Sequence, residues 1–163
     1  MTTTEPTPVA SPVGGRDLQL ATRATRAVLD RVLADAGITF EQMAVLNTIE
    51  LEGGSIAGDA LAVQLVQILK IDDAAARRAI ATVAEPGLVQ PVGEQPEQLE
   101  LSAAGRRLHA DYSRQSFQIS AEVWGGLPQE DLAATKRVLD AVTGRANAML
   151  AAVDRERAGQ RTR

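Results

Sequence analysis

The order of the helix signals in residues 39–87 restricts the possible folds of this chain more than any other feature. Thr39 and Gln42 match a capping box, in which each side chain bonds a backbone amide at a helix start. Apolar residues then recur at helical spacing in three short runs, and Asp72 or Asp73 is placed to cap the third. The residues expected to face a core are Met43, Leu46, Ile49, Leu61, Leu65, Ile68, Leu69, Ala76, Ala79, Ile80 and Val83.

A short hairpin is expected directly after these three helices. Val89–Val92 and Gln98–Leu101 have the composition of strands, and apolar residues alternate with polar ones in the second, as in a half-buried strand. Gly93–Glu97 is the expected turn, and Ser102 is expected to open a further long helix. Helices followed by a hairpin and another helix are the order of a winged helix-turn-helix, a mainly α fold that usually reads DNA.

Further helical patterns flank this segment on both sides. The boundaries expected from periodicity and from glycine breaks are residues 17–36, 102–124 and 128–153 for the flanking helices, with the winged-helix lobe at about 38–101. Residues 1–16 are rich in proline and small polar residues, a composition that predicts a disordered tail. Residues 154–163 form a polar tail that we expect to be frayed.

The composition suggests that this single domain of 163 residues needs a partner. Aromatic residues make up only 2% of the chain, so the core must be built from aliphatic side chains and alanine. The helices at residues 17–36 and 128–153 carry apolar stripes that one lobe would leave partly uncovered, and such patches usually mark interfaces. We therefore expect a homodimer formed by the first helix and the last two.

Several classes of function are disfavoured by what the sequence lacks. There is no cysteine and only one histidine, His109, which excludes thiolate chemistry and a multi-histidine metal site. No nucleophile elbow or phosphate-binding glycine loop is present, so an enzyme is not expected, nor is a cofactor or a metal. The first residues do not have the pattern of a signal peptide and no stretch is long and apolar enough for a membrane span, so we expect a cytoplasmic protein.

The order of these elements resembles the MarR family of bacterial transcriptional regulators, over about Asp17 to Val153. Three phrases carry the resemblance together, and none is a strong motif alone: Thr39-x-x-Gln42-x-x-Val45-Leu46, Gly87-Leu88-Val89 and Leu101-Ser102-x-x-Gly105-Arg106. The resemblance implies a homodimer with a winged lobe on each side, which acts as a transcriptional regulator. Many members release DNA when a small aromatic ligand binds between the lobes.

The resemblance also places candidate ligand-binding residues on the helix that follows the wing. His109 and Tyr112 would lie near the ligand pocket, where a ring could stack on an aromatic ligand and the imidazole could bond its hydroxyl or carboxylate. Packing in a core with satisfied polar tips explains the same residues equally well. For Trp124 on this helix, packing in the dimer core is the better interpretation.

The segment that the resemblance assigns to DNA reading departs from the family pattern. The recognition helix would be Asp73–Ala84, and its only cations are Arg77 and Arg78. The wing, which normally carries arginines, has none. Arg106 and Arg107 follow the wing and are candidates for phosphate contacts, although a solvated pair at a helix start is the more ordinary interpretation.

The charge of this segment leaves two functions open. From Asp59 to Leu101 the chain has seven acidic residues and three basic ones, a net charge of −4. DNA binders commonly neutralise about 6–10 phosphates with lysine and arginine, so duplex DNA should be bound weakly or atypically. The first function is a MarR-like dimeric regulator that responds to a small aromatic ligand. The alternative is a degenerate relative that has lost DNA binding and binds a small molecule or a protein partner.

Overall fold

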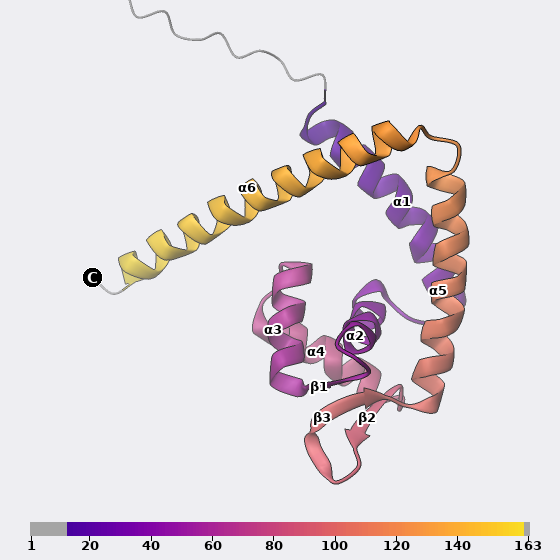
Figure 1. The fold of residues 1–163 in the computed structure, drawn as a ribbon. Helices are drawn as coiled ribbons and strands as arrows, with labels where there is room; N and C mark the ends of the chain where they lie inside the picture. The colour runs from indigo at the N-terminus through magenta and orange to yellow at the C-terminus, as the bar shows by residue number, and fades with distance from the viewer. Residues whose placement is uncertain (1–12, 162–163) are drawn as a thin grey trace, which may run out of the picture. The chain divides into compact units, whose positions relative to one another are not determined.

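The computed structural model describes residues 13–161, apart from the side chains of residues 158 and 161. This part of the chain belongs to two compact units, which divide between Gln118 and Ile119. The elements are α1 (Gly15–Asp35), α2 (Phe40–Leu51), β1 (Ser55–Ala57), α3 (Gly58–Leu69), α4 (Asp73–Ala84), β2 (Val89–Val92), β3 (Gln95–Leu101), α5 (Ala103–Trp124) and α6 (Gln129–Arg161) (Figure 1). The expected winged helix-turn-helix with flanking helices is confirmed.

The residues that the sequence analysis predicts to cap helices form the expected hydrogen bonds. The Thr39 hydroxyl accepts from the Gln42 amide at 3.2 Å, and the Gln42 side-chain oxygen accepts from the Thr39 amide at 2.8 Å. The Gln42 Nε2 also donates to the Thr82 carbonyl at 3.1 Å, which ties the start of α2 to α4. Asp72 caps α4 by accepting from the Ala75 amide at 2.7 Å. The capping residues therefore fix both where these helices begin and how they meet.

An aliphatic core fills the first unit. Its large, fully buried side chains come from α1, α2, α3, α4 and β3, and they are Leu33, Met43, Leu46, Ile49, Leu61, Leu65, Leu101, Val45 and Val83. Tyr112, which is 8% exposed, is the one aromatic residue of the buried core among the described residues. The expectation that Ile68 faces inward is wrong, because its side chain is 58% exposed and Val66 packs on the core in its place.

The sheet has one strand more than the sequence analysis predicts. β3 lies between β1 and β2 and pairs antiparallel with both. The short strand β1 was not expected; its middle residue, Ile56, is buried opposite Leu99. The expected turn at Gly93–Glu97 is also too long, because β3 already begins at Gln95. A positive φ of 54° at Gly93 allows the tighter turn.

The junction between the wing and α5 requires a residue without a side chain. The Ser102 amide donates to the Leu88 carbonyl at 2.9 Å, and the Ser102 hydroxyl caps α5 by accepting from the Gly105 amide. A Cβ atom at Gly105 would lie 2.1 Å from the Leu88 carbonyl oxygen. Glycine at this position therefore lets the first turn of α5 pack directly against the backbone of Leu88, which precedes β2.

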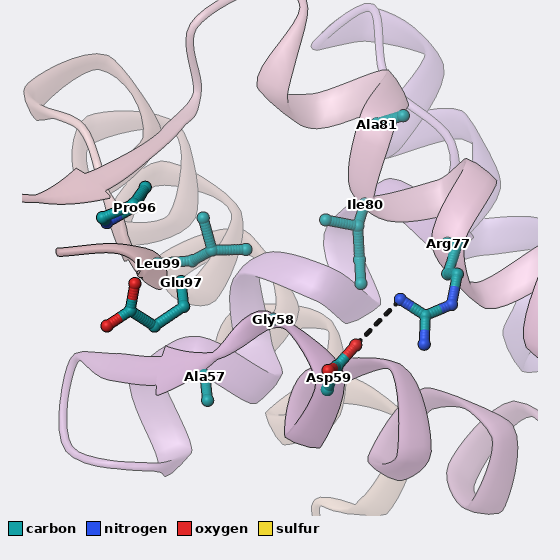
Figure 2. A pocket seen from close by; sticks show the side chains of 9 residues that line it. All are labelled: Ala57, Gly58, Asp59, Arg77, Ile80, Ala81, Pro96, Glu97 and Leu99. Carbon is teal, nitrogen blue, oxygen red and sulfur yellow. Dashed lines mark hydrogen bonds and ion pairs between the residues drawn. The ribbon is translucent and has the colours of Figure 1, made fainter.

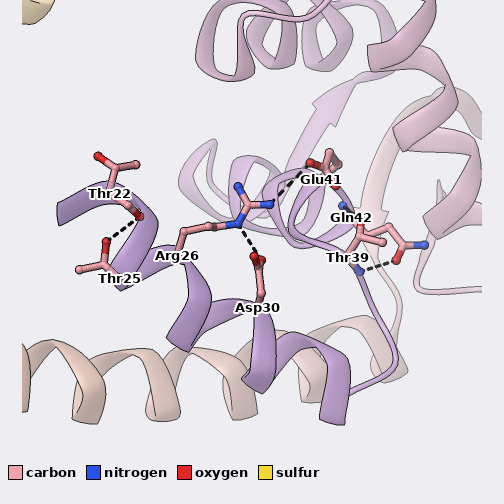
Figure 3. A network of polar contacts seen from close by, with 7 residues as sticks. All are labelled: Thr22, Thr25, Arg26, Asp30, Thr39, Glu41 and Gln42. Atoms are coloured by element: carbon pink, nitrogen blue, oxygen red, sulfur yellow. Dashed lines mark hydrogen bonds and ion pairs between the residues drawn. The ribbon is translucent and has the colours of Figure 1, made fainter. Parts of the chain in front are cut away.

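A polar network joins α1 to α2 within the first unit (Figure 3). Arg26 donates to Asp30 at 2.6 Å and lies 3.8 Å from Glu41 on α2. Its guanidinium also stacks 3.8 Å from the centre of the Phe40 ring. The Arg26 side chain thus contacts both a carboxylate and an aromatic ring of α2.

The second unit contains the end of α5 and all of α6, and none of its described residues is buried. Helix α6 has 33 residues and reaches Arg161, so residues 154–161, expected to be frayed, are helical. Its exposed large apolar residues are Val138, Leu139, Val142, Met149, Leu150 and Val153. At the other end of the chain, α1 begins at Gly15, and the predicted tail lies outside the described residues up to residue 12. None of the described helices combines the length and hydropathy of a membrane span.

Candidate nucleic-acid interface

Helices α3 and α4 and the β2–β3 hairpin form the reading motif predicted from the sequence. The short connection Lys70-Ile71-Asp72 joins the two helices, and Lys70 adopts a left-handed conformation at the end of α3. Ala76, Ala79 and Val83 hold the buried side of α4. The opposite side of α4 carries both arginines and is exposed to solvent.

Arg77 is held by two carboxylates, of which Figure 2 shows Asp59. Its Nε donates to Asp73 at 2.8 Å, one turn earlier on α4, and its Nη1 donates to Asp59 at 2.9 Å, in the first turn of α3. The hydrogen bond to Asp73, followed by that to Asp59, raises the pKa of Arg77. The guanidinium therefore stays charged, but its charge is balanced within the protein.

Arg78 is the exposed cation of α4 that has neither an ion pair nor a hydrogen bond to another side chain in the described part of the chain. Arg77 has Asp73 as an ion-pair partner four residues earlier on α4. The residue four positions before Arg78 is Ala74, which cannot form such a pair. Of the two predicted DNA-reading arginines, Arg78 is the one whose charge is available to a phosphate or a base.

The wing presents carboxylates where the resemblance leads one to expect arginines. Glu94 is exposed in the turn of the hairpin, and Glu97 is exposed on β3 near that turn. Glu100 is half-buried and accepts from the Gln90 side chain at 2.9 Å across the β2–β3 pair. The hairpin therefore carries negative charge at its tip, which opposes approach to a phosphate backbone.

Arg106 and Arg107 have different surroundings at the start of α5. The Arg106 guanidinium donates to the Leu101 carbonyl, so it completes the end of β3. Arg107 is exposed and pairs with no carboxylate among the described residues. The structure thus gives Arg106 a structural contact that the sequence did not reveal, and leaves the Arg107 charge exposed.

A pocket of about 560 Å³ lies between the start of α3, the exposed side of α4 and the wing (Figure 2). Its walls are mostly apolar and carry one cation and two carboxylates; the lining residues are Ala57, Gly58, Asp59, Arg77, Ile80, Ala81, Pro96, Glu97 and Leu99. Neither His109 nor Tyr112 lines it. No group of three or more potential metal ligands occurs in the described part of the chain.

His109 and Tyr112 lie on α5 within the first unit. Tyr112 is buried in the aliphatic core, and His109 is half-buried with its Nε2 2.8 Å from the Oδ1 of Asn47 on α2. This bond links α5 to α2. It agrees with the interpretation of a packed residue with a satisfied polar tip, and the predicted ligand-binding role of both residues stays a prediction.

The sequence matches no protein-family model and is not significantly similar to any curated protein. The structure, in contrast, is similar to solved transcriptional regulators. The regulator PA3341 has a TM-score of 0.67 at 23% identity, over 82% of this chain and 97% of that one. A mutant of MarR from E. coli, solved with operator DNA, has a TM-score of 0.63 at 21% identity, over 78% and 91% of the two chains. The fold is that of MarR.

A third similar structure comes from Bordetella bronchiseptica. It is that of BpsR, whose DNA binding is regulated by 6-hydroxynicotinic acid, and it has a TM-score of 0.64 at 24% identity. The alignment covers 84% of this chain and 99% of BpsR. The structural similarity therefore extends over nearly the full length of these three regulators. Because the sequence identity is low, the function has to be argued from this chain's own residues.

Proposed function

We propose that this chain is a MarR-like dimeric transcriptional regulator that binds duplex DNA weakly. The observation that carries the proposal is a solvent-exposed α4 face, with Arg77 and Arg78, beside a wing in the MarR fold. In a helix-turn-helix the second helix enters the major groove, and α4 occupies that position.

The dimer is supported by the apolar surface outside the winged lobe. On α1, Leu18, Leu20 and Val28 are each more than 40% exposed, and on α6 Met149 is 71% exposed. Large apolar side chains exposed on each of these helices favour a second copy of the chain as the partner, since exposed apolar patches usually mark interfaces. The exposed ion pair Lys136–Asp140 also lies on α6.

Weak binding follows from the charges of the reading surface. Arg77 reaches DNA only if phosphate replaces Asp59 or Asp73, and Glu94 and Glu97 repel the backbone. Arg78, Arg107 and Lys70 are exposed cations without a partner among the described residues, fewer than the phosphates that strong DNA binders neutralise.

We further propose that this regulator responds to a small aromatic ligand. The regulation of BpsR by a hydroxylated aromatic acid provides the precedent, and His109 and Tyr112 supply a polar ring and a phenol on α5. A small aromatic ligand that displaced the Asn47 contact of His109 would loosen α5 from α2. Loss of the His109–Asn47 contact would thus change how α5 is attached to the helices of the winged lobe.

The same charges favour a second candidate function, a MarR-fold protein that no longer binds DNA and recognises a small molecule or a protein partner. Fluorescence anisotropy of a labelled mixed-sequence duplex, titrated with protein at increasing salt, separates the two. A regulator gives saturable binding at low salt that weakens as salt rises. Absence of binding even at low salt supports the second candidate.

A further inference from the structure

Lys70 has an unusual backbone conformation for its residue type. With φ of 57° and ψ of 37°, it is the one non-glycine residue with positive φ in the described part of the chain. The left-handed region costs a residue with a Cβ atom about 1 kcal/mol relative to glycine. The six other positive-φ positions described here are all glycines.

The local structure does not require a lysine at this position. The Lys70 amide donates to the Val66 carbonyl at 3.0 Å and closes α3, a bond that a glycine would make equally well. The Lys70 side chain is exposed and forms neither an ion pair nor a hydrogen bond with any described residue. A positive charge at the end of α3 is favourable for the helix dipole, but that effect is small in water.

The position of Lys70 in the turn before α4 would bring its charge close to the DNA backbone. It lies three residues before Asp73, where the recognition helix α4 begins. When the start of such a helix meets base edges, the preceding turn lies beside the rim of the groove, where the phosphates are. A flexible ammonium group at this point can reach a phosphate as a point charge.

We propose that Lys70 is a phosphate-contacting residue that positions α4 on duplex DNA. The inference rests on the proposed function and adds a contact to those predicted from the sequence. It explains why a strained lysine occupies the turn. It also gives the acidic reading motif a cation that, unlike Arg77, is not balanced by a carboxylate in the structure.

Chemical footprinting tests the contact directly, because the chain has only two lysines, Lys70 and Lys136. The full-length protein is acetylated with an amine-reactive reagent, with and without a mixed-sequence duplex at low salt, and each site is quantified by mass spectrometry. We expect DNA to protect Lys70 several-fold and to leave Lys136, which pairs with Asp140 on α6, unprotected. Equal modification of Lys70 in both samples, while the DNA is bound, would overturn the proposal.

Variants provide the second arm of the test. Lys70→Gly should keep or raise the melting temperature, yet weaken DNA binding and lower the slope of log affinity against log salt by about 0.9. Lys70→Arg, which keeps the charge, should bind like the natural chain. If Lys70→Gly only lowers the melting temperature and binds DNA unchanged, the lysine is structural and the inference is wrong. If the natural chain binds no DNA at any salt, the proposed function itself fails.

Discussion

The two units of this molecule are stabilised in different ways. In the first unit, aliphatic side chains from five elements reach complete burial, and Leu46, Leu61 and Leu65 are each 0% exposed. In the second unit, none of the described residues is buried, although α6 carries large apolar side chains from Leu132 to Val153. A helix with so little burial gains little free energy from its own chain. The first unit therefore has a core of its own, whereas the apolar side chains of α6 are exposed and are the ones that the proposed homodimer would cover.

Breaking the second unit's expected interface should have the largest effect. The double variant Val142→Asp/Met149→Asp places two carboxylates on the apolar side of α6, and an unpaired buried charge costs about 3 kcal/mol or more. Light scattering at micromolar concentration should then give the mass of a monomer, while the natural chain gives that of a dimer.

A control for this prediction is Asn147→Asp, which adds a negative charge at an exposed polar position on α6. It should leave the dimer mass unchanged. A monomer mass for the natural chain would refute the homodimer, and the apolar face of α6 would then need a different partner.

The stability of the first unit should depend on its internal packing. Gly105→Ala forces a Cβ atom to 2.1 Å from the Leu88 carbonyl oxygen and should lower the free energy of unfolding by about 1–3 kcal/mol. Denaturant titration followed by circular dichroism measures this loss. Gly144→Ala is the matched control, because its Cβ atom meets no neighbour within 4 Å and alanine favours a helix interior. Equal stability of the two variants would contradict the packing argument.

Local chemistry explains which features could be predicted from the sequence. The Thr39–Gln42 capping box and Gly87 act through neighbours within a few residues, so their patterns are visible in the chain itself. Strand β1 has three residues, too few to show an alternation, and it becomes a strand only by pairing with β3, far along the chain. The prediction for Ile68 is wrong because helical spacing indicates the apolar face of a helix but not which edge of that face the neighbouring elements cover.

The candidate site was less predictable for the same reason. The sequence identified Arg77 as a DNA-reading residue, and the i,i+4 spacing with Asp73 was visible in principle. Asp59, however, is 18 residues away and approaches Arg77 only when α3 and α4 pack together. The charge count therefore predicts weak binding of DNA by this segment. That Asp59 neutralises Arg77 in particular becomes visible only in the folded structure.

A smaller effect is expected from releasing Arg77 within the first unit. Asp59→Asn removes one of its two carboxylate partners, so the guanidinium becomes more available to phosphate and DNA affinity should rise a few-fold at low salt. The unfolding transition should barely change, because exposed ion pairs contribute little to stability. Fluorescence anisotropy with a labelled duplex gives the affinity, and an unchanged affinity would show that Arg77 does not reach the DNA.

The most direct test of weak DNA binding compares the natural chain with Glu94→Arg/Glu97→Arg across a salt series. Both glutamates are exposed on the wing, so the change reverses charge without disturbing the core. We expect weak binding by the natural chain, and tighter binding by the variant with a slope steeper by up to about 0.9 for each new phosphate contact. Nanomolar binding by the natural chain in physiological salt, with no gain in the variant, would contradict this account of the acidic wing.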